Sequence, residues 1–367
     1  MKKVPTIHAR AGRSAWGLFA LVAVTAATGL LSATAQAAPH TFYGLVPNSD
    51  LRAADYRLMQ KANVGSARVS LFWHVIEARK NQFDWGATDA VIGALAASNI
   101  QALPSLFGTP KWLAKDPTKP PVGSKRQRAE WSEFIGEAVR RYGNGGTYWS
   151  SVYPTQHPGE TPLPIAAWQV WNEVNGPKHF HPRPDVGKYA QLLKITSEAI
   201  KRGDRSAEIV TSGLVSKPTG KGGIEGWNYL TKLLKEKGAK RSLDHAALHP
   251  YAVDERRLFK DVKKMRRALK KGGKKKGQTW ITEVGWSSDR KGKGKLAKSP
   301  TEQATLLKKT YTQLARKRTS WKVGGVYWYT WRDSRGPRVC DWCPTAGLVK
   351  RNLKPKPAFN QYRKLAR

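Results

Sequence analysis

Cysteine is scarce in this sequence, because its 367 residues include only Cys340 and Cys343. A metal site needs more ligands than two thiolates, and the pair lacks the strand–helix–strand context near the start of a chain that marks a thioredoxin-like redox motif. In an exported protein, two cysteines at this spacing most often form a small local disulfide. We therefore predict a Cys340–Cys343 disulfide, and we expect no metal and no other cofactor.

Long hydrophobic runs are also lacking, with one exception at residues 16–33. That run follows four basic residues and precedes Ala35-Gln36-Ala37, which is the pattern of a secretory signal peptide with a small-residue cleavage site. An uncleaved membrane anchor is the alternative, because a tilted helix of this length can span a bilayer. The cleavage site and the following Pro39 favour removal. We therefore expect residues 1–37 to be a signal peptide, and the protein to be secreted, extracellular or periplasmic, without a membrane anchor.

Acidic residues are few, since 26 Asp and Glu stand against 65 Lys and Arg, for a formal net charge of +39. Such an excess attracts polyanions, whether an acidic polysaccharide, an anionic cell surface or nucleic acid, and it can also be a bias of the whole proteome. Much of it lies at 263–271, 274–276 and 291–298, in segments typical of a solvated helix face and Gly/Lys loops. No nucleic-acid motif is present. We expect a monomer with only non-specific attraction to anionic surfaces and no specific nucleic acid.

A glycine-rich phosphate loop is missing after the first predicted strand, and no repeat or low-complexity linker divides the chain. From about residue 41, short apolar runs typical of buried strands alternate with amphipathic stretches typical of helices. Eight such units favour a single α/β domain at residues 38–367, a (β/α)8 TIM barrel, over the alternative of a doubly wound open sheet. The predicted strands are 42–46, 66–73, 100–106, 168–175, 209–215, 243–251, 279–286 and 323–331.

Polar residues with catalytic chemistry lie near the ends of several predicted strands. Arg68 lies on the second, Asn172-Glu173 follows the fourth, His249-Pro250-Tyr251 ends the sixth, and Glu283 lies on the seventh. Barrels of this kind place their active sites at the carboxyl ends of the strands, so these residues should converge. Because strands four and seven lie nearly opposite each other, Glu173 and Glu283 would supply the two carboxylates that glycoside hydrolysis requires.

The sequence around these carboxylates resembles a known group of enzymes. Asn172-Glu173 and Thr282-Glu283-Val284-Gly285-Trp286 resemble motifs of the clan of retaining glycoside hydrolases with (β/α)8 barrels. The positions that match cellulase-like family 5 are Arg68, His249-Pro250-Tyr251 and Trp331, whereas Gly108-Thr109-Pro110-Lys111-Trp112 is more similar to families 39 and 42. The resemblance implies a glycosidase that hydrolyses O-glycosidic bonds of a β-linked polysaccharide or oligosaccharide.

The resemblance also implies a role for each polar residue. Glu173 would be the general acid and base, and Glu283 the nucleophile that forms a glycosyl–enzyme ester. Arg68 would keep Glu283 ionised, whereas Glu173 would stay protonated in a less polar environment. Asn172 would donate to the sugar 2-hydroxyl, and Tyr251 would orient Glu283. In a retaining enzyme the two carboxyl groups lie about 5–5.5 Å apart, and we expect that spacing here.

Aromatic side chains would complete the cleft by stacking on the apolar faces of sugar rings. The candidates are Trp73, Trp286, Trp328 and Trp331. Alternation along the eighth strand places Trp328 and Trp331 on opposite faces, so at most one reaches the cleft unless a bulge intervenes, and we favour Trp331. His249 is either a sugar ligand or a core histidine with satisfied polar atoms.

A protein that binds carbohydrate or an anionic surface without turnover, on the same scaffold, is the alternative function. The presence of both carboxylates favours the enzyme. Measurable glycan binding together with a negative hydrolysis screen would support the alternative.

Overall fold

The computed structural model describes residues 37–47, 50–290, 294–335 and 340–367 of the chain. Eight parallel strands close into a barrel in which each strand pairs with its neighbours in the sequence and β1 pairs with β8. The predicted (β/α)8 barrel is therefore confirmed, and the open-sheet alternative is wrong. The strands are β1 Tyr43–Val46, β2 Ser66–Phe72, β3 Gln101–Phe107, β4 Ala167–Val170, β5 Glu208–Val215, β6 His245–His249, β7 Thr279–Val284 and β8 Val323–Tyr329.

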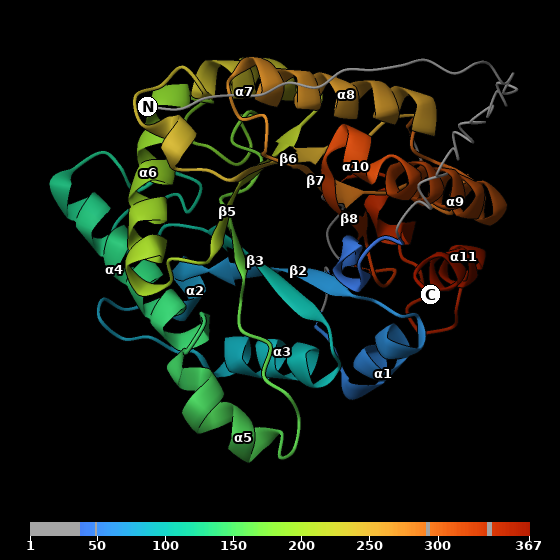
Figure 1. The fold of residues 1–367 in the computed structure, drawn as a ribbon, viewed down its shortest axis with the longest axis horizontal. Helices are drawn as coiled ribbons and strands as arrows, with labels where there is room; N and C mark the ends of the chain where they lie inside the picture. Colours follow the sequence, from blue (N-terminus) through green and yellow to red (C-terminus); the bar gives the residue numbers. More distant parts are fainter. Residues whose placement is uncertain (1–36, 48–49, 291–293, 336–339) are drawn as a thin grey trace, which may run out of the picture. The chain divides into compact units, whose positions relative to one another are not determined.

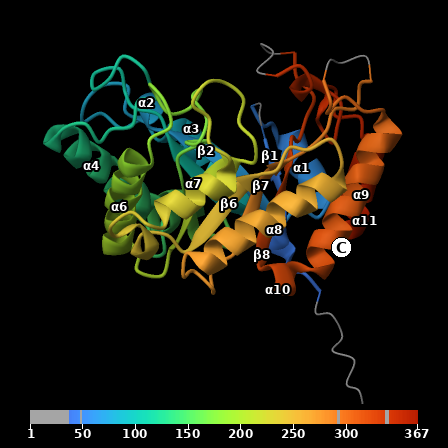
Figure 2. The same ribbon diagram turned by 90° about the horizontal axis from the view of Figure 1, so that it is seen from above.

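Helices surround the barrel, as Figure 1 shows. The loops that follow β5 and β7 extend from one side of the barrel, which is the upper side in Figure 2. The α-helices are α1 Ala53–Lys61, α2 Trp73–Ile76, α3 Gly86–Ala97, α4 Lys125–Tyr142, α5 Tyr153–Gln156, α6 Val186–Gly203, α7 Gly226–Leu233, α8 Glu255–Lys271, α9 Pro300–Arg316, α10 Arg318–Trp321 and α11 Pro357–Leu365. Shorter helical turns are η1 His40–Phe42, η2 Tyr148–Val152, η3 Ala239–Arg241 and η4 Cys343–Thr345.

Helix α4 illustrates how the sequence specifies an outer helix. Its first turn is capped by Ser124, whose side chain accepts a hydrogen bond from the backbone N–H of Gln127. Its apolar residues recur at i, i+3, i+4 and i+7, so they form one stripe that packs against the barrel. The fully buried members of that stripe are Trp131, Phe134, Ile135 and Ala138.

The interior of the barrel is partly polar. One buried apolar cluster is formed by Val46, Leu103, Ala167, Val210, Ala247 and Tyr327, which come from six different strands. Several buried polar side chains also lie on the strands, namely Arg68, Ser105, Gln169, Thr211, His249, Thr282 and Glu283. A buried polar group without a hydrogen-bond partner is costly, so this set has to be bonded internally or serve a ligand.

Several strands end earlier than the sequence pattern predicts. β4 ends at Val170, β6 at His249 and β8 at Tyr329, whereas the apolar and aromatic runs continue to residues 175, 251 and 331. The residues beyond these ends leave the sheet and form the loops on the carboxyl side. The Gly/Pro-rich connection at 143–164 also contains two short helical elements, η2 and α5, that the sequence pattern does not predict.

The predicted signal peptide lies outside the described residues except for Ala37, so its cleavage and the export of the protein remain predictions. The segment Ala37–Arg367 forms one compact unit. Within the described part of the chain, no helix is long and apolar enough to cross a membrane.

Candidate active site

Glu173 lies just beyond the end of β4, where the backbone turns sharply. Trp171 and Glu173 adopt left-handed backbone conformations, with φ of 71° and 45°. Such angles are rare for residues other than glycine and cluster at functional sites. The turn is anchored by the fully buried Trp171, whose Nε1 donates to the backbone carbonyl of His179 at 2.7 Å. Because of this turn, Glu173 forms part of the wall of a cleft at the mouth of the barrel.

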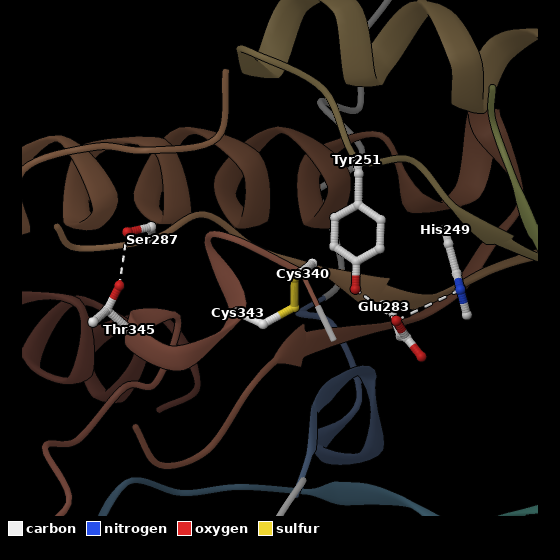
Figure 3. The surroundings of a disulfide bond; sticks show 7 residues. All are labelled: His249, Tyr251, Glu283, Ser287, Cys340, Cys343 and Thr345. Atoms are coloured by element: carbon white, nitrogen blue, oxygen red, sulfur yellow. Dashed lines mark hydrogen bonds and ion pairs between the residues drawn. A yellow bond between two sulfur atoms is a disulfide. The ribbon is translucent and has the colours of Figure 1, made fainter. Parts of the chain in front are cut away.

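Glu283 lies on β7, at an irregularity of the sheet. The register between β7 and β8 shifts between Ile281 and Val284, on either side of Glu283. Arg68 donates from Nη1 to Glu283 Oε1 at 2.7 Å, and Tyr251 donates its hydroxyl to Oε2 at 2.5 Å. Figure 3 shows the hydroxyl of Tyr251 pointing at Glu283. Both carboxylate oxygens are thus held, which fixes the orientation of the group.

The two carboxylates lie close together. One oxygen of Glu173 and one oxygen of Glu283 lie within 4.8 Å of each other, and both lie within that distance of a ring nitrogen of His249. The side chains of Glu173 and Glu283 are 19% and 11% exposed, so each retains a small face toward the cleft. Strands four and seven therefore bring together the two residues that the sequence singles out.

A chain of hydrogen bonds connects Arg68 to His249 across the barrel. Arg68 can only donate, so the amide oxygen of Gln169 faces its Nε, and Gln169 Nε2 faces Thr282 Oγ1 at 3.2 Å. Thr282 Oγ1 in turn lies 3.1 Å from His249 Nε2. The other ring nitrogen, Nδ1, lies 2.9 Å from Glu173 Oε1. Because an ionised carboxylate can only accept hydrogen bonds, His249 donates from Nδ1 to Glu173.

His249 is fully buried, and it is not part of the lining of the cleft. A side chain at Gly213 on β5 would place its Cβ 1.9 Å from His249 Nε2, so glycine is required there for the imidazole to fit. The structure therefore differs from the prediction of His249 as a sugar-binding residue. It matches the other reading, a core histidine whose polar atoms are satisfied. Its Nδ1 contacts both carboxylates, at 2.9 Å from Glu173 Oε1 and 3.6 Å from Glu283 Oε2.

Glu173 has a second histidine partner, which sequence reasoning left without a role. His179 Nδ1 lies 3.0 Å from Glu173 Oε2. Burial raises the pKa of Glu173, but hydrogen bonds and charge from His179 and His249 outweigh it, so the pKa lies below its ordinary value. This result corrects the expectation that a less polar environment keeps Glu173 protonated. The only sequence signal for His179 is its place six residues after Glu173, in the same loop.

Tyr251 and Asn172 lie where their predicted roles require. Burial raises the pKa of Tyr251 well above its ordinary value, and the charge of Glu283 raises it further, so the phenol keeps its proton and remains a donor. Asn172 accepts a hydrogen bond from Arg68 Nη2 at 2.8 Å through Oδ1. That contact assigns the amide, so its Nδ2 donors are the groups that Asn172 can offer to a ligand in the cleft.

The cleft that contains both carboxylates has a volume of about 410 Å³. Its wall includes two aromatic side chains, Tyr329 and Trp342, that sequence reasoning did not assign to the site. The ring centroid of Trp342 lies 5.0 Å from that of Tyr251 and 5.9 Å from that of Tyr329. The three rings therefore form one aromatic wall next to the nucleophile, which Tyr251 contacts directly.

Trp342 is held by the predicted disulfide. Cys340 and Cys343 are bonded, with Cα atoms 5.4 Å apart, and both lie in the wall of the cleft. Figure 3 shows the disulfide beside Tyr251 and Glu283. The CxxC pattern predicted the bond but not its place, because nothing in the spacing indicates that Trp342, one of the two residues between the cysteines, lines the cleft of the carboxylates.

The tryptophans predicted to stack on sugar rings lie elsewhere. All four are fully buried, namely Trp73, Trp286, Trp328 and Trp331, and none lines the cleft. The indole N–H of Trp331 donates to Asp55 Oδ1 at 2.7 Å, and that of Trp286 donates to the carbonyl of Ala252 at 2.7 Å. Trp73, the first residue of α2, packs against Phe134 of α4. These large side chains belong to the hydrophobic core. Burial of an indole ring is favourable over its whole apolar area once the N–H has a hydrogen-bond partner.

Glu173, His249 and Glu283 also offer ligand atoms close enough for a metal ion, and they are the one such group of three within the described segments. Their contacts do not fit that use. Arg68 and Tyr251 already donate to the two oxygens of Glu283, and a cation there would face the guanidinium at short range. The group is explained by its hydrogen bonds, so we derive no metal chemistry from it.

Comparison with known proteins is consistent with this geometry. The model of glycoside hydrolase family 42, described as β-galactosidase, matches residues 46–181. No curated protein matches the sequence. Among solved structures, a family 39 glycoside hydrolase from Bacteroides cellulosilyticus is 19% identical, with a TM-score of 0.65 over 89% of this chain and 63% of that one. The chain thus spans less than two thirds of that relative.

Two further structures show the same fold. A family 39 enzyme from Xanthomonas axonopodis is 20% identical, with a TM-score of 0.63 over 91% of this chain and 68% of that one. A monomeric β-xylosidase from Caulobacter crescentus is 17% identical, with a TM-score of 0.63 over 90% of this chain and 69% of that one. The resemblance predicted from the motifs at Glu173 and Glu283 is confirmed: in its fold, this chain is similar to the (β/α)8 glycoside hydrolases.

Proposed function

We propose that the protein is a secreted, monomeric glycosidase that hydrolyses β-glycosidic bonds of a polysaccharide or oligosaccharide with retention of configuration. The observation that carries the proposal is the separation of the two carboxylates, whose nearest oxygens lie within 4.8 Å. Retaining glycosidases hold their carboxyl groups about 5–5.5 Å apart, whereas inverting ones leave about 6.5–9.5 Å for a water molecule. The separation in this site supports a double displacement.

In the first step, an oxygen of Glu283 attacks the anomeric carbon while the bond from that carbon to the leaving oxygen breaks. Glu173 gives its proton to the leaving oxygen, so the alcohol departs neutral and a glycosyl ester of Glu283 remains. In the second step, water attacks the anomeric carbon, Glu173 takes a proton from it, and the ester bond breaks. Arg68 and Tyr251 hold the departing carboxylate of Glu283.

The rate of the first step depends on pH because Glu173 must be protonated to act as the acid. The lowered pKa of Glu173 favours the ionised group in the ligand-free site. The acid form is populated as the pH falls, so the first step is favoured in acidic solution. His179 and His249, both in contact with this carboxylate, determine how acidic that solution has to be.

The aromatic wall supports a carbohydrate substrate. Tyr251, Tyr329 and Trp342 present ring faces and edges to the cleft beside the nucleophile. Sugar rings have apolar faces that pack on such surfaces, while their hydroxyls bond to polar groups such as Asn172. The family description and the β-xylosidase among the similar structures both name β-glycosides, which supports the β linkage.

The test is hydrolysis of a panel of aryl β-glycosides by the protein and by Glu173→Ala and Glu283→Ala. Each substitution should reduce kcat by about 10³-fold or more, because the missing carboxylate takes part in bond breaking. Added azide should restore turnover in at least one variant, since the small anion can replace the lost group. Full activity in either variant would refute the assignment. Glycan binding without hydrolysis of any glycoside would favour the non-catalytic alternative.

Export is tested separately. The protein should be recovered outside the cytoplasm with an amino terminus near Ala38, because the small-residue site ends at Ala37. A full-length, membrane-bound product would contradict cleavage.

A further inference from the structure

A second cleft, of about 480 Å³, opens beside the active-site cleft. The two clefts share Lys217 and Tyr251 in their walls, so they are adjacent. Tyr251 is the residue whose hydroxyl lies 2.5 Å from the nucleophile Glu283. The second cleft therefore begins one side chain away from the reacting centre, where the remainder of a bound glycan would lie.

The charge of this second cleft is strongly positive. Its lining includes the five cations Lys217, Arg257, Lys260, Lys264 and Lys295, and a single carboxylate, Asp261. We call these five residues the basic groove. Within the described segments, the only ion pair that any of the five makes joins Lys264 to Asp261 at 3.9 Å. The other four cations make no ion pair among the described residues, although the charge of Lys217 also acts on Asp261.

Asp261 can neutralise at most one of these five charges. It is 9% exposed, and although burial raises its pKa, the charges of Lys264 and Lys217 act in the opposite direction. Its partner Lys264 is also directed over the ring of Trp227, with Nζ 4.0 Å from the ring centroid. The exposed cations Arg257, Lys260 and Lys295 line the groove on the solvent side. Like charges gathered in one hollow repel one another, so an anion that enters relieves this repulsion.

The basic groove differs from the other lysine-rich hollows that the structure describes. One of them, lined by Arg52, Lys350, Arg351, Lys354 and Lys356, has a similar charge with Asp333 as its single carboxylate, but it shares no residue with the active-site cleft. The hollow beside Lys274, at 274–276, also contains Glu208 and Asp244 in its lining, so its charges are balanced in part. That hollow does not share residues with the active-site cleft. The basic groove therefore combines two features, uncompensated charge and contact with the cleft of the two carboxylates, that the general excess of lysine does not explain.

We propose that the basic groove binds anionic groups of the glycan whose glycosidic bond lies between Glu173 and Glu283. The substrate is then a glycan that carries carboxylate or sulfate groups. This inference rests on the proposed function, because it assigns the groove to the same bound chain of sugars. Lys217, which borders both clefts, lies where the two parts of that chain meet.

Binding is measured with the whole protein carrying Glu283→Gln, so that no probe is consumed. The probes are an oligogalacturonate, a heparin-derived oligosaccharide and a neutral cello-oligosaccharide of equal length, which separate carboxylate, sulfate and neutral sugar, and a single-stranded DNA. The groove variant combines Arg257→Gln, Lys260→Gln and Lys295→Gln. The matched control, on the far end of α8, combines Arg267→Gln, Lys270→Gln and Lys271→Gln, which are equally exposed and line no described cleft.

At low ionic strength we expect at least one anionic glycan to bind about tenfold more tightly than the neutral one. The groove variant should lose most of that preference, and the control should stay within about twofold of the parent. The preference should shrink at high salt, which screens exposed charges. Equal losses in the groove variant and the control, or no preference over the neutral glycan, would refute the proposal. DNA binding with the same dependence on the groove and no glycan preference would also refute it.

The two proposals fail in different ways. Hydrolysis of neutral aryl β-glycosides tests Glu173 and Glu283 without the groove, and the control variant on α8 should keep that activity. If no β-glycoside is hydrolysed but the binding pattern holds, the groove remains and the catalytic proposal falls. If aryl glycosides are hydrolysed but the groove variant binds anionic glycans like its parent, only the groove assignment falls.

Discussion

Nδ1 of His249 lies 2.9 Å from Oε1 of Glu173, and this contact joins the proposed acid/base to a buried network that reaches across the barrel. The network runs from Arg68 through Gln169 and Thr282 to the imidazole, so the guanidinium that contacts the nucleophile is also connected to the acid/base. Glu173 and Glu283 are thus oriented by one set of hydrogen bonds.

The lowered pKa of Glu173 predicts an acidic pH optimum. Its protonated form drives the first step, so kcat/KM should fall as the pH rises through this pKa. His179→Phe removes one of the contacts that lower the pKa, so the pKa should rise and the alkaline limb should move to higher pH. The profile of kcat/KM against pH for both proteins checks this. An alkaline limb that stays in place, or moves to lower pH, would contradict it.

Removal of Arg68 should affect both stability and activity. Arg68→Met leaves the carboxylate of Glu283 buried without its cation, and the loss of one partner of a buried pair costs about 3–5 kcal/mol. Denaturant unfolding measures this loss, and turnover of aryl glycosides should be nearly abolished. The control is Arg141→Met, which breaks a more exposed pair with Asp89 and should leave kcat unchanged. A loss for Arg68→Met no larger than that for the control would show that the buried pair is not needed.

Tyr251→Phe should lower kcat without unfolding the protein. The substitution removes only the hydroxyl that donates to Glu283 Oε2 and keeps the ring in the aromatic wall. A hydrogen bond to a charged group contributes about 1.5–3 kcal/mol, so kcat/KM should fall about 10- to 100-fold. Steady-state kinetics and the melting temperature separate the two effects. Unchanged kcat/KM would mean that Tyr251 does not orient the nucleophile.

Trp342→Ala should weaken oligosaccharide binding more than it slows hydrolysis of small aryl glycosides. Burial of a large apolar side chain against a ligand contributes about 1.5–3 kcal/mol, so Kd should rise about 10- to 100-fold. The double variant Cys340→Ser/Cys343→Ser keeps the indole but releases its loop, and we expect a smaller loss in the same direction. Titration calorimetry measures Kd for both variants, each made in the inactive Glu283→Gln protein. Unaltered Kd in Trp342→Ala would remove this residue from the binding site.

The sequence predicts the barrel well because this fold is specified by the alternation of apolar and polar residues along the chain. Alternation of apolar strands with amphipathic helices is local, and eight repetitions leave few other arrangements. Glu173 and Glu283 follow from the same logic, since the carboxyl ends of barrel strands share one face. The contacts of Arg68 and Tyr251 with Glu283 are expected from the resemblance to the glycoside hydrolases, and the structure contains both hydrogen bonds.

The aromatic residues show where such reasoning stops. Trp331 and Trp286 resemble sugar platforms in the sequence, yet each indole N–H finds a partner in the core and the ring is buried. Trp342 lies in a loop whose course depends on a disulfide and on contacts with Tyr251 and Tyr329, which no local pattern encodes. Which aromatic side chains reach the cleft depends on their contacts with residues far away in the sequence, and the residue type alone does not reveal these contacts.

The central claim is that Glu283 forms a covalent ester with the sugar. The most direct test is mass spectrometry of the protein after incubation with activated 2-deoxy-2-fluoro β-glycosides. Their fluorine slows both steps, whereas the activated leaving group speeds only the formation of the ester, so the ester accumulates. The sugars chosen are those whose aryl β-glycosides are hydrolysed. We predict a mass increase of one fluorosugar per chain, located by peptide mapping at Glu283 and missing in Glu283→Ala. An adduct on another residue, or turnover of these reagents with no adduct and inverted product, would contradict the account.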